Sequence, residues 1–258
     1  MDFQSEKMLE KYVRLREEVV DPYVPDFAVA DGTTRYVRFN DAWRGLNPYS
    51  MFLIPRLVNA KNVFPKKTSA KIATNANPDN YVTLRYDGSG TLRTARLGKY
   101  QNTEAAIVYV SKQLSISYSL SVPVSDKPSY ELLDFEWREF DDAGRLIGVE
   151  EYQSRGVPSD DVIMNCEYYE YDGDVLSHAW CFQNFEKYPM QLTLDLVRQF
   201  MPDRIFNPDQ TEYFFQPVTD GLDYTSKQYY RKSQTFTNEG HVSLETLSRL
   251  ADQGIRLI

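Results

Sequence analysis

The sequence is poor in the residues that carry metal and redox chemistry, with only two cysteines and two histidines among 258 residues. Cys166, Cys181, His178 and His241 do not show the clustered spacing of a zinc site, so we expect no metal and no cofactor. The phosphate-loop, dinucleotide-binding, G-x-S-x-G and H-E-x-x-H motifs are also absent from the sequence. No catalytic residue is therefore predicted, and the pattern favours a binding protein over an enzyme without deciding between them.

Long apolar runs are missing too. The chain has no run of about eighteen apolar residues, the length that a membrane-spanning helix requires, so we expect no membrane partner. The first residues are rich in Glu, Lys and Arg and contain no apolar stretch of the kind found in signal peptides. Together with the low cysteine content, this predicts a reducing cytoplasmic environment.

The charge balance excludes one class of partner. The chain carries 37 acidic against 29 basic residues, a formal net charge of −8. General nucleic-acid binding depends on clustered Lys and Arg at the phosphates, so we expect no nucleic acid. An acidic surface suits a basic protein partner, and it serves solubility equally well.

Aromatic residues are abundant. Tyr (19) and Phe (14) bring the aromatic share to 14%, within a hydrophobic share of 42%. These residue types suit the half-buried surface of a pleated sheet, and Tyr is also favoured at binding surfaces. We expect a packed β-rich fold, and we see no low-complexity linker that would divide residues 1–258 into two domains.

Residues 1–80 are predicted to hold an N-terminal helix and a loop-rich segment. Apolar side chains at Met8, Tyr12, Leu15 and Val19 share one helical face over residues 3–20. Asp21-Pro22 ends this helix, because proline disfavours helical backbone in the residue before it. Frequent prolines up to residue 80 indicate loops with short strands, one of them at 35–39.

Residues 81–186 are predicted to form an antiparallel meander of hairpins. Alternating strands of eight to ten residues meet at Asp/Gly-rich turns near 87–90, 141–144 and 172–174. Residues 187–258 are predicted to hold two helices, 189–201 and 244–252, with Ser243 as the N-cap of the second. A last strand pair is expected at 212–216 and 226–237. The fold class is therefore β-rich α+β.

Three of the hairpins share one turn signature. In each, an aromatic residue and an Asp precede the turn, a Gly lies within it, and a Leu follows. The Asp is expected to bond backbone amides of its own turn, and the Gly to adopt positive φ. The turn-forming residues are Asp87 and Gly90, Asp141 and Gly144, and Asp172 and Gly173.

This signature resembles the YD repeats of Rhs and teneurin shells, in which such repeats wind a long sheet around a cargo. The likeness is carried by Phe140–Val149 and by Tyr169-Glu170-Tyr171-Asp172, within roughly residues 81–186. The first copy lacks the Arg that follows the turn Gly, and the third is one residue shorter. A short set of such hairpins is similar to bacterial immunity and antitoxin-type proteins encoded beside polymorphic toxins, which implies a cognate toxin as partner.

The two cysteines are predicted to face each other across one hairpin. If that hairpin pivots on Gly173-Asp174, Cys166 lies directly opposite Cys181. Two reduced thiols are the first interpretation of the pair and a disulfide is the second, and a one-residue bulge would separate them. His178 and Cys181, three residues apart on a strand, are expected on opposite faces, and His241 is expected in an exposed loop.

Three function classes remain open. The first is a protein-binding protein, with an aromatic surface rimmed by acids; the second is a hydrolase-like enzyme with an acidic or Tyr-based site; the third is a structural or secretion-accessory component that assembles through sheet edges. Neighbouring acids such as Glu150-Glu151 split to opposite faces of a strand, which argues against a carboxylate pair. The oligomeric state stays open. The candidate partner-binding residues are Trp137, Tyr152, Tyr169, Tyr171 and Trp180.

Overall fold

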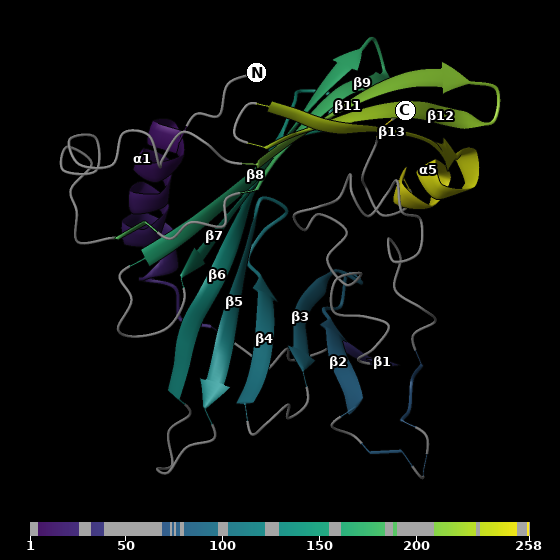
Figure 1. Cartoon of the computed structure of the whole chain (residues 1–258). Helices are drawn as coiled ribbons and strands as arrows, with labels where there is room; N and C mark the ends of the chain where they lie inside the picture. Colours follow the sequence, from purple (N-terminus) through teal and green to yellow (C-terminus); the bar gives the residue numbers. More distant parts are fainter. Residues whose placement is uncertain are drawn as a thin grey trace.

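The structure is a computed structural model of the whole chain. It describes residues 5–25, 32–38, 69–72, 74, 76–77, 80–97, 103–121, 129–154, 161–183, 188–189, 209–230, 233–251 and 257. Figure 1 shows these residues as helices and strands, with their labels.

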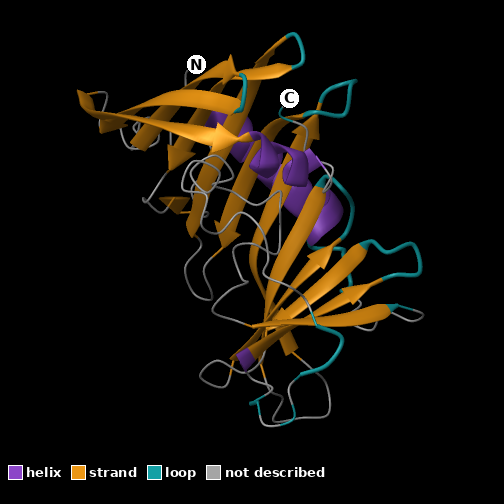
Figure 2. Ribbon diagram, turned by 90° about the vertical axis from the view of Figure 1, so that its right-hand side faces the viewer, coloured by secondary structure: helices purple, strands orange, loops and turns teal. Residues whose placement is uncertain are grey.

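The described strands form one antiparallel sheet, ordered almost entirely as in the sequence. Each strand from β1 to β9 pairs with the next, β11 to β13 continue the series after β9, and β10 pairs with β8. The expected β-rich antiparallel meander is thus confirmed. The sheet twists strongly, so that β9 and β11–β13 cross above the earlier strands in Figure 1, and Figure 2 shows this twist from the side.

The bounds of the strands follow the predicted hairpins closely over residues 81–183. The first strands are β1 (Thr33–Arg38), β2 (Tyr81–Tyr86), β3 (Leu92–Leu97), β4 (Thr103–Tyr109), β5 (Leu114–Ser121) and β6 (Ser129–Phe140). The later strands are β7 (Leu146–Ser154), β8 (Asp161–Asp172), β9 (Val175–Gln183), β10 (Tyr188–Pro189), β11 (Asp209–Val218), β12 (Gly221–Tyr230) and β13 (Ser233–Ser243).

Two helical elements frame the sheet. The first is α1 (Ser5–Leu15), which continues as a π-helical segment η1 (Arg16–Val20). The second is α5 (Leu244–Ala251), whose first turn is capped as predicted by Ser243, since its Oγ accepts a hydrogen bond from the Thr246 amide at 3.3 Å. Neither described helix is long and apolar enough to cross a membrane. Of the helix predicted at 189–201, Pro189 belongs to β10 and the remainder lies outside the described residues.

The helices α1 and α5 pack on opposite faces of the sheet, which we name the α1 face and the α5 face. On the α1 face, Met8 and Tyr12 of the helix pack among strand residues such as Phe135. On the α5 face, Leu247 packs among strand residues such as Leu146. Because side chains alternate along a strand, each central strand contributes to both cores. The predicted stripe on the first helix is confirmed, with Met8, Tyr12 and Leu15 buried.

The first two of the repeated turns share one backbone geometry, and the third is a shorter turn in which Asp172 pairs with Val175. In the first turn the amide of Gly90 donates to the carbonyl of Asp87, and in the second the amide of Gly144 donates to the carbonyl of Asp141. Gly90 (φ 83°), Gly144 (φ 78°) and Gly173 (φ 57°) all have positive φ, as expected. The three hairpins also share a one-residue bulge beside the turn. It leaves the aromatic residue opposite the Leu in each: Tyr86–Leu92, Phe140–Leu146 and Tyr171–Leu176.

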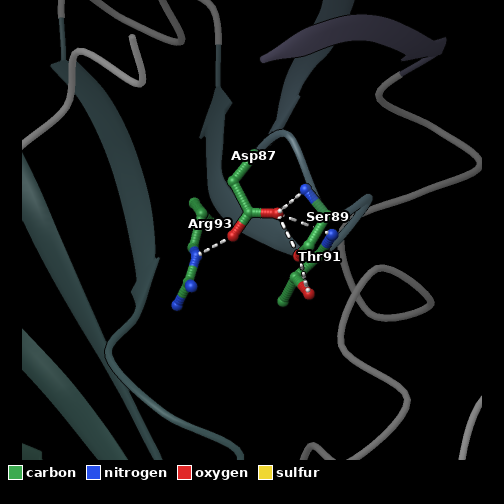
Figure 3. A network of polar contacts seen from close by, with 4 residues as sticks. All are labelled: Asp87, Ser89, Thr91 and Arg93. Carbon is green, nitrogen blue, oxygen red and sulfur yellow. Dashed lines mark hydrogen bonds and ion pairs between the residues drawn. The ribbon is translucent and has the colours of Figure 1, made fainter. Parts of the chain in front are cut away.

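The first two turn aspartates bind their own turns. Asp87 Oδ1 accepts hydrogen bonds from the Ser89 amide (2.9 Å) and the Thr91 amide (3.0 Å), while its Oδ2 accepts one from Arg93 Nε at 2.6 Å (Figure 3). These hydrogen bonds lower the pKa of Asp87. The largest contribution comes from the hydrogen bond that the Ser89 hydroxyl donates to Asp87 Oδ1. Asp141 accepts from the amide and from Nε of Arg145 at 2.8 and 2.7 Å, and its pKa is lowered as well.

Arg145 joins the second turn to the third. Besides Asp141, its guanidinium donates to the carbonyl oxygen of Gly173 and lies 4.5 Å from the centroid of the Tyr171 ring. The arginine that follows the turn glycine therefore ties adjacent hairpins together, while the aspartate holds its own turn.

Two predictions about strands and registers are corrected. The single strand pair expected at 212–216 and 226–237 is a three-stranded unit, because the chain turns at Asp220-Gly221 and because residues 226–230 and 233–237 belong to two strands, β12 and β13, that pair with each other. His241 accordingly lies in a strand, not in a loop.

The prediction that Cys166 and Cys181 lie directly opposite each other is wrong. The bulge at Glu170/Tyr171 shifts the register by one residue, so Cys166 lies opposite Phe182 and Cys181 opposite Glu167. A one-residue shift exchanges the faces of a strand. Cys166 belongs to the α1-face core and Cys181 to the α5-face core, and neither cysteine forms a disulfide.

Candidate functional site

The five aromatic residues predicted to bind a partner do not form one surface. Tyr152, Tyr169 and Trp180 are buried, at 0%, 4% and 4% exposure, while Trp137 and Tyr171 are half-buried. Trp137, Tyr152 and Trp180 belong to the α1-face core, whereas Tyr169 and Tyr171 belong to the α5-face core. Because side chains alternate between the two faces of a strand, these five residues lie on both faces of the sheet. Their apolar rings pack in the two cores.

Polar side chains instead form a row across the α5 face, which we name the polar row. Five residues on β4 to β8 lie directly opposite one another in succession: Tyr109, Ser115, Glu136, Glu151 and Asn165. Ser115, Glu136 and Asn165 are buried. Glu136 and Glu151 are adjacent like charges, an arrangement that destabilises a sheet unless neighbouring groups compensate.

The compensation comes from residues of the polar row and its neighbours. Arg138, 1% exposed, donates to Glu136 Oε2 at 3.0 Å and to the Ser115 hydroxyl at 2.5 Å. Asn165 Nδ2 donates to Glu151 Oε2 at 2.8 Å. Both carboxylates are therefore engaged by groups of the sheet itself.

Glu167 lies two residues after Asn165 on β8, on the same face of the sheet, and is fully buried. The Tyr169 hydroxyl donates to its Oε2 at 2.5 Å, and Cys181 Sγ lies 3.5 Å from its Oε1. Burial raises the pKa of Tyr169, and the Glu167 carboxylate raises it further. This carboxylate, like those of Glu136 and Glu151, is held inside the fold.

Asp134 is a further acid of this face, and its pKa is shifted towards neutral pH. Burial raises its pKa to about 6; a hydrogen bond with Ser117 lowers the pKa and the Glu136 charge raises it. A carboxyl group that titrates near neutral pH can act as a general acid or base. Among the described residues, no group of three or more His, Cys, Asp and Glu side chains is arranged to hold a metal ion.

An open pocket lies at the other end of the sheet, on strands β11, β12 and β13. Its volume is about 690 Å³. We name it the β11–β13 pocket. Its lining residues are Phe214, Phe215, Gln216, Asp223, Tyr224, Thr225, Glu239, Gly240 and His241.

The strand register places the polar lining of this pocket on the α1 face, beyond the strands that α1 covers. Phe214 lies opposite His178, which stands on the face away from Cys181 as predicted. Two cross-strand rows follow from the pairing. One contains Gln216, Asp223 and His241, and the next contains Phe214, Thr225 and Glu239.

Phe214 is one of the few large apolar side chains exposed among the described residues, at 37%. One part of its ring stacks on His178, with centroids 4.4 Å apart. The ammonium of Lys227 lies 4.8 Å from the ring centroid. The ring is therefore held firmly in place while part of its surface faces solvent.

His241 is tied to the carboxylates around it. Its Nδ1 lies 2.8 Å from Asp223 Oδ1, and its Nε2 lies 3.9 Å from Asp220 Oδ2. The hydrogen bond with Asp223 raises the pKa of His241, and the charge of Asp220 adds to the effect. Both carboxylates remain largely exposed, with side-chain exposures of 57% and 83%.

Among the described side chains at this end of the sheet, carboxylates outnumber lysine and arginine. Lys227 is the one lysine or arginine among the side chains that the structure describes from β11 to α5. The carboxylates described there are Glu212, Asp220, Asp223, Glu239 and Glu245. The pocket thus combines an exposed aromatic ring with a negative rim.

The sequence analysis missed these residues because it took β12 and β13 for one strand. The Asp220-Gly221 dipeptide is a hairpin signal that marks the turn from β11 into β12, although it does not mark the separation of β12 from β13. With that turn recognised, the alternation of Asp223, Thr225 and Lys227 predicts a polar face on β12. To predict that Asp223 and Glu239 lie close together, one also needs the register in which β13 pairs with β12.

The chain matches no family model, no curated protein and no solved structure with which it was compared.

Proposed function

We propose that this chain is a non-catalytic protein-binding protein of the bacterial immunity or antitoxin type, which caps a toxin partner. The observation that carries the proposal is the β11–β13 pocket, where the exposed Phe214 ring lies beside the carboxylates of Asp223 and Glu239. Aromatic side chains dominate the energetics of protein interfaces, and a charged rim selects and steers the partner.

Two further features support the same proposal. The net charge of −8 suits a basic partner. The YD-like hairpins resemble those of proteins linked to polymorphic toxins, and their three turns share one bulge and one aromatic–Leu pairing. In this proposal the protein acts in the cytoplasm, where its two cysteines stay reduced.

The test is a binding experiment with the product of the adjacent gene. The two proteins are co-expressed with a tag on one of them, and the complex is analysed by size-exclusion chromatography and light scattering. We expect a stoichiometric complex and relief of the partner's toxicity in a growth assay. A partner that elutes alone and stays toxic in the presence of this chain would contradict the proposal.

A hydrolase-like function is the second candidate, and Asp134 is the observation that favours it. Its carboxyl group has a pKa of about 6 and lies on the same face of the sheet as Glu136 and Glu151. The test is hydrolysis of chromogenic esters, glycosides and phosphoesters by the wild type and by Asp134→Asn. An enzyme would lose activity in this variant and would show a pH–rate inflection near 6 that disappears with it.

A further inference from the structure

Two acidic residues that line the β11–β13 pocket, Asp223 and Glu239, lie on neighbouring strands. Asp223 lies opposite His241, and Glu239 lies two residues before His241 on β13. Asp223 and Glu239 are therefore diagonal neighbours on one face, a relationship that in antiparallel sheets separates two residues by roughly 7–8 Å, with their Cβ atoms somewhat closer. A group that enters between them contacts both carboxylates.

The third side of the site is apolar. Phe214 lies opposite Thr225, which separates it from Glu239 in the same cross-strand row. Phe214 lines the same pocket as the two acids, and 37% of its surface is exposed. A ligand that fits this arrangement has an apolar stem for the ring and a charged head for the carboxylates.

The charge of that head follows from the surroundings. Asp220 and Asp223 lie largely exposed at the β11–β12 turn, and Glu239 is exposed on β13. His241 is the one basic group that lines the pocket among the described residues, and it is bound to Asp223. A concave surface lined by charges of one sign focuses the potential and attracts the opposite charge.

We infer that the β11–β13 pocket binds a lysine or arginine side chain of the protein partner, with its stem on Phe214 and its charged head between Asp223 and Glu239. Long basic side chains pack their methylene stems on apolar surfaces while the head stays in a polar environment. This inference rests on the proposed function, since it names the partner chemistry of the same surface.

The experiment measures binding of a fluorescently labelled nona-arginine peptide by anisotropy at low and at physiological salt. The pocket variant carries Asp223→Asn with Glu239→Gln. The control variant carries Asp142→Asn with Asp174→Asn, which removes two exposed turn carboxylates elsewhere and changes the net charge equally. Circular dichroism and thermal melting establish that both variants fold.

We expect the pocket variant to weaken peptide binding about tenfold and the control variant less than about twofold, because only the first removes the charges that hold the head. Phe214→Ala keeps the charge and is expected to weaken binding about fivefold. Equal weakening by both double variants would overturn the inference, since binding would then follow net charge alone. Unchanged binding in Phe214→Ala and the pocket variant would overturn it as well.

The same variants separate this inference from the proposed function. If the wild type forms a complex with the adjacent gene product and the pocket variant forms it equally tightly, the pocket assignment fails while the function stands. If the wild type forms no such complex but the pocket variant still binds the peptide more weakly than the control variant does, the proposed function fails. The assignment of the pocket as a site for a basic side chain then stands.

Discussion

Lys11 of α1 and Glu150 of β7 form an ion pair between the N-terminal helix and the sheet, with Nζ 2.8 Å from Oε2. The carboxylate side chain is 6% exposed and also accepts hydrogen bonds from the hydroxyls of Tyr152 (2.8 Å) and Tyr168 (3.3 Å). Glu139 lies 2.6 Å from the same ammonium. Burial alone would lower the pKa of Lys11, but the two carboxylates outweigh it and raise the pKa.

Replacement of Lys11 by Met is expected to destabilise the fold by about 3 kcal/mol, because Glu150 is then left as a buried charge without its cation. The measurement is urea unfolding followed by circular dichroism. Asp21→Asn serves as the control, since it breaks the more exposed Arg16–Asp21 pair and should cost about 0.5 kcal/mol. Equal losses in the two variants would show that Lys11 does not anchor α1.

Two glycines should respond differently to alanine. At Gly144 (φ 78°) an added Cβ meets no atom within 4 Å, so Gly144→Ala should cost about 1 kcal/mol from backbone strain alone. At Gly221 the Cβ would collide with the carbonyl oxygen of Val242, and this backbone atom cannot rotate away. We expect Gly221→Ala to cost about 3 kcal/mol in urea unfolding. A smaller loss at Gly221 than at Gly144 would contradict the described β12–β13 pairing.

The turn aspartates should make the fold sensitive to acid. The pKa values of Asp87 and Asp141 are lowered in the folded protein, so their contribution to stability is present above the unfolded pKa of about 3.9 and is lost as the pH falls below it. We expect Asp141→Asn to lower the urea midpoint at pH 7 and to reduce the difference between pH 7 and pH 3. Asp142→Asn, which alters the exposed neighbour in the same turn, should leave that difference unchanged.

The thiols of Cys166 and Cys181 should not form a disulfide within the native chain. They stand on opposite faces of the sheet, and burial raises the pKa of Cys166, which keeps this thiol protonated and slow to react. Mass mapping after mild oxidation of the folded protein should recover both cysteines unlinked. Ellman's reagent should react with them quickly only after unfolding in urea. A linked peptide from the native protein would refute the described register.

The hairpins of residues 81–183 could be predicted because their determinants are local. Apolar side chains alternate along each strand, and an Asp and a Gly occupy the turn positions that their chemistry suits. The capped helix α5 followed from Ser243 and the apolar spacing after it for the same reason. Such patterns depend on neighbours in the chain, which the sequence displays directly.

The registers could not be predicted with the same reliability. Because of the bulge beside Tyr171, the residue opposite Cys181 is Glu167 and not Cys166, and the sequence analysis had counted the pairing without this bulge. The same limit applies to Trp137, Tyr152, Tyr169, Tyr171 and Trp180, whose residue types suit an interface and a core equally well. The structure assigned them to two cores.

The repeated Asp/Gly turn was determined by the sequence alone, since each of its residues acts on backbone atoms within a few positions. The tertiary structure decided which side chains meet across the sheet. Asp223 and Glu239 share the pocket only because β12 and β13 pair in one register, and Arg145 reaches Gly173 only because adjacent hairpins lie side by side. Contacts between distant residues depend on strand order, bulges and twist, which are properties of the folded sheet as a whole.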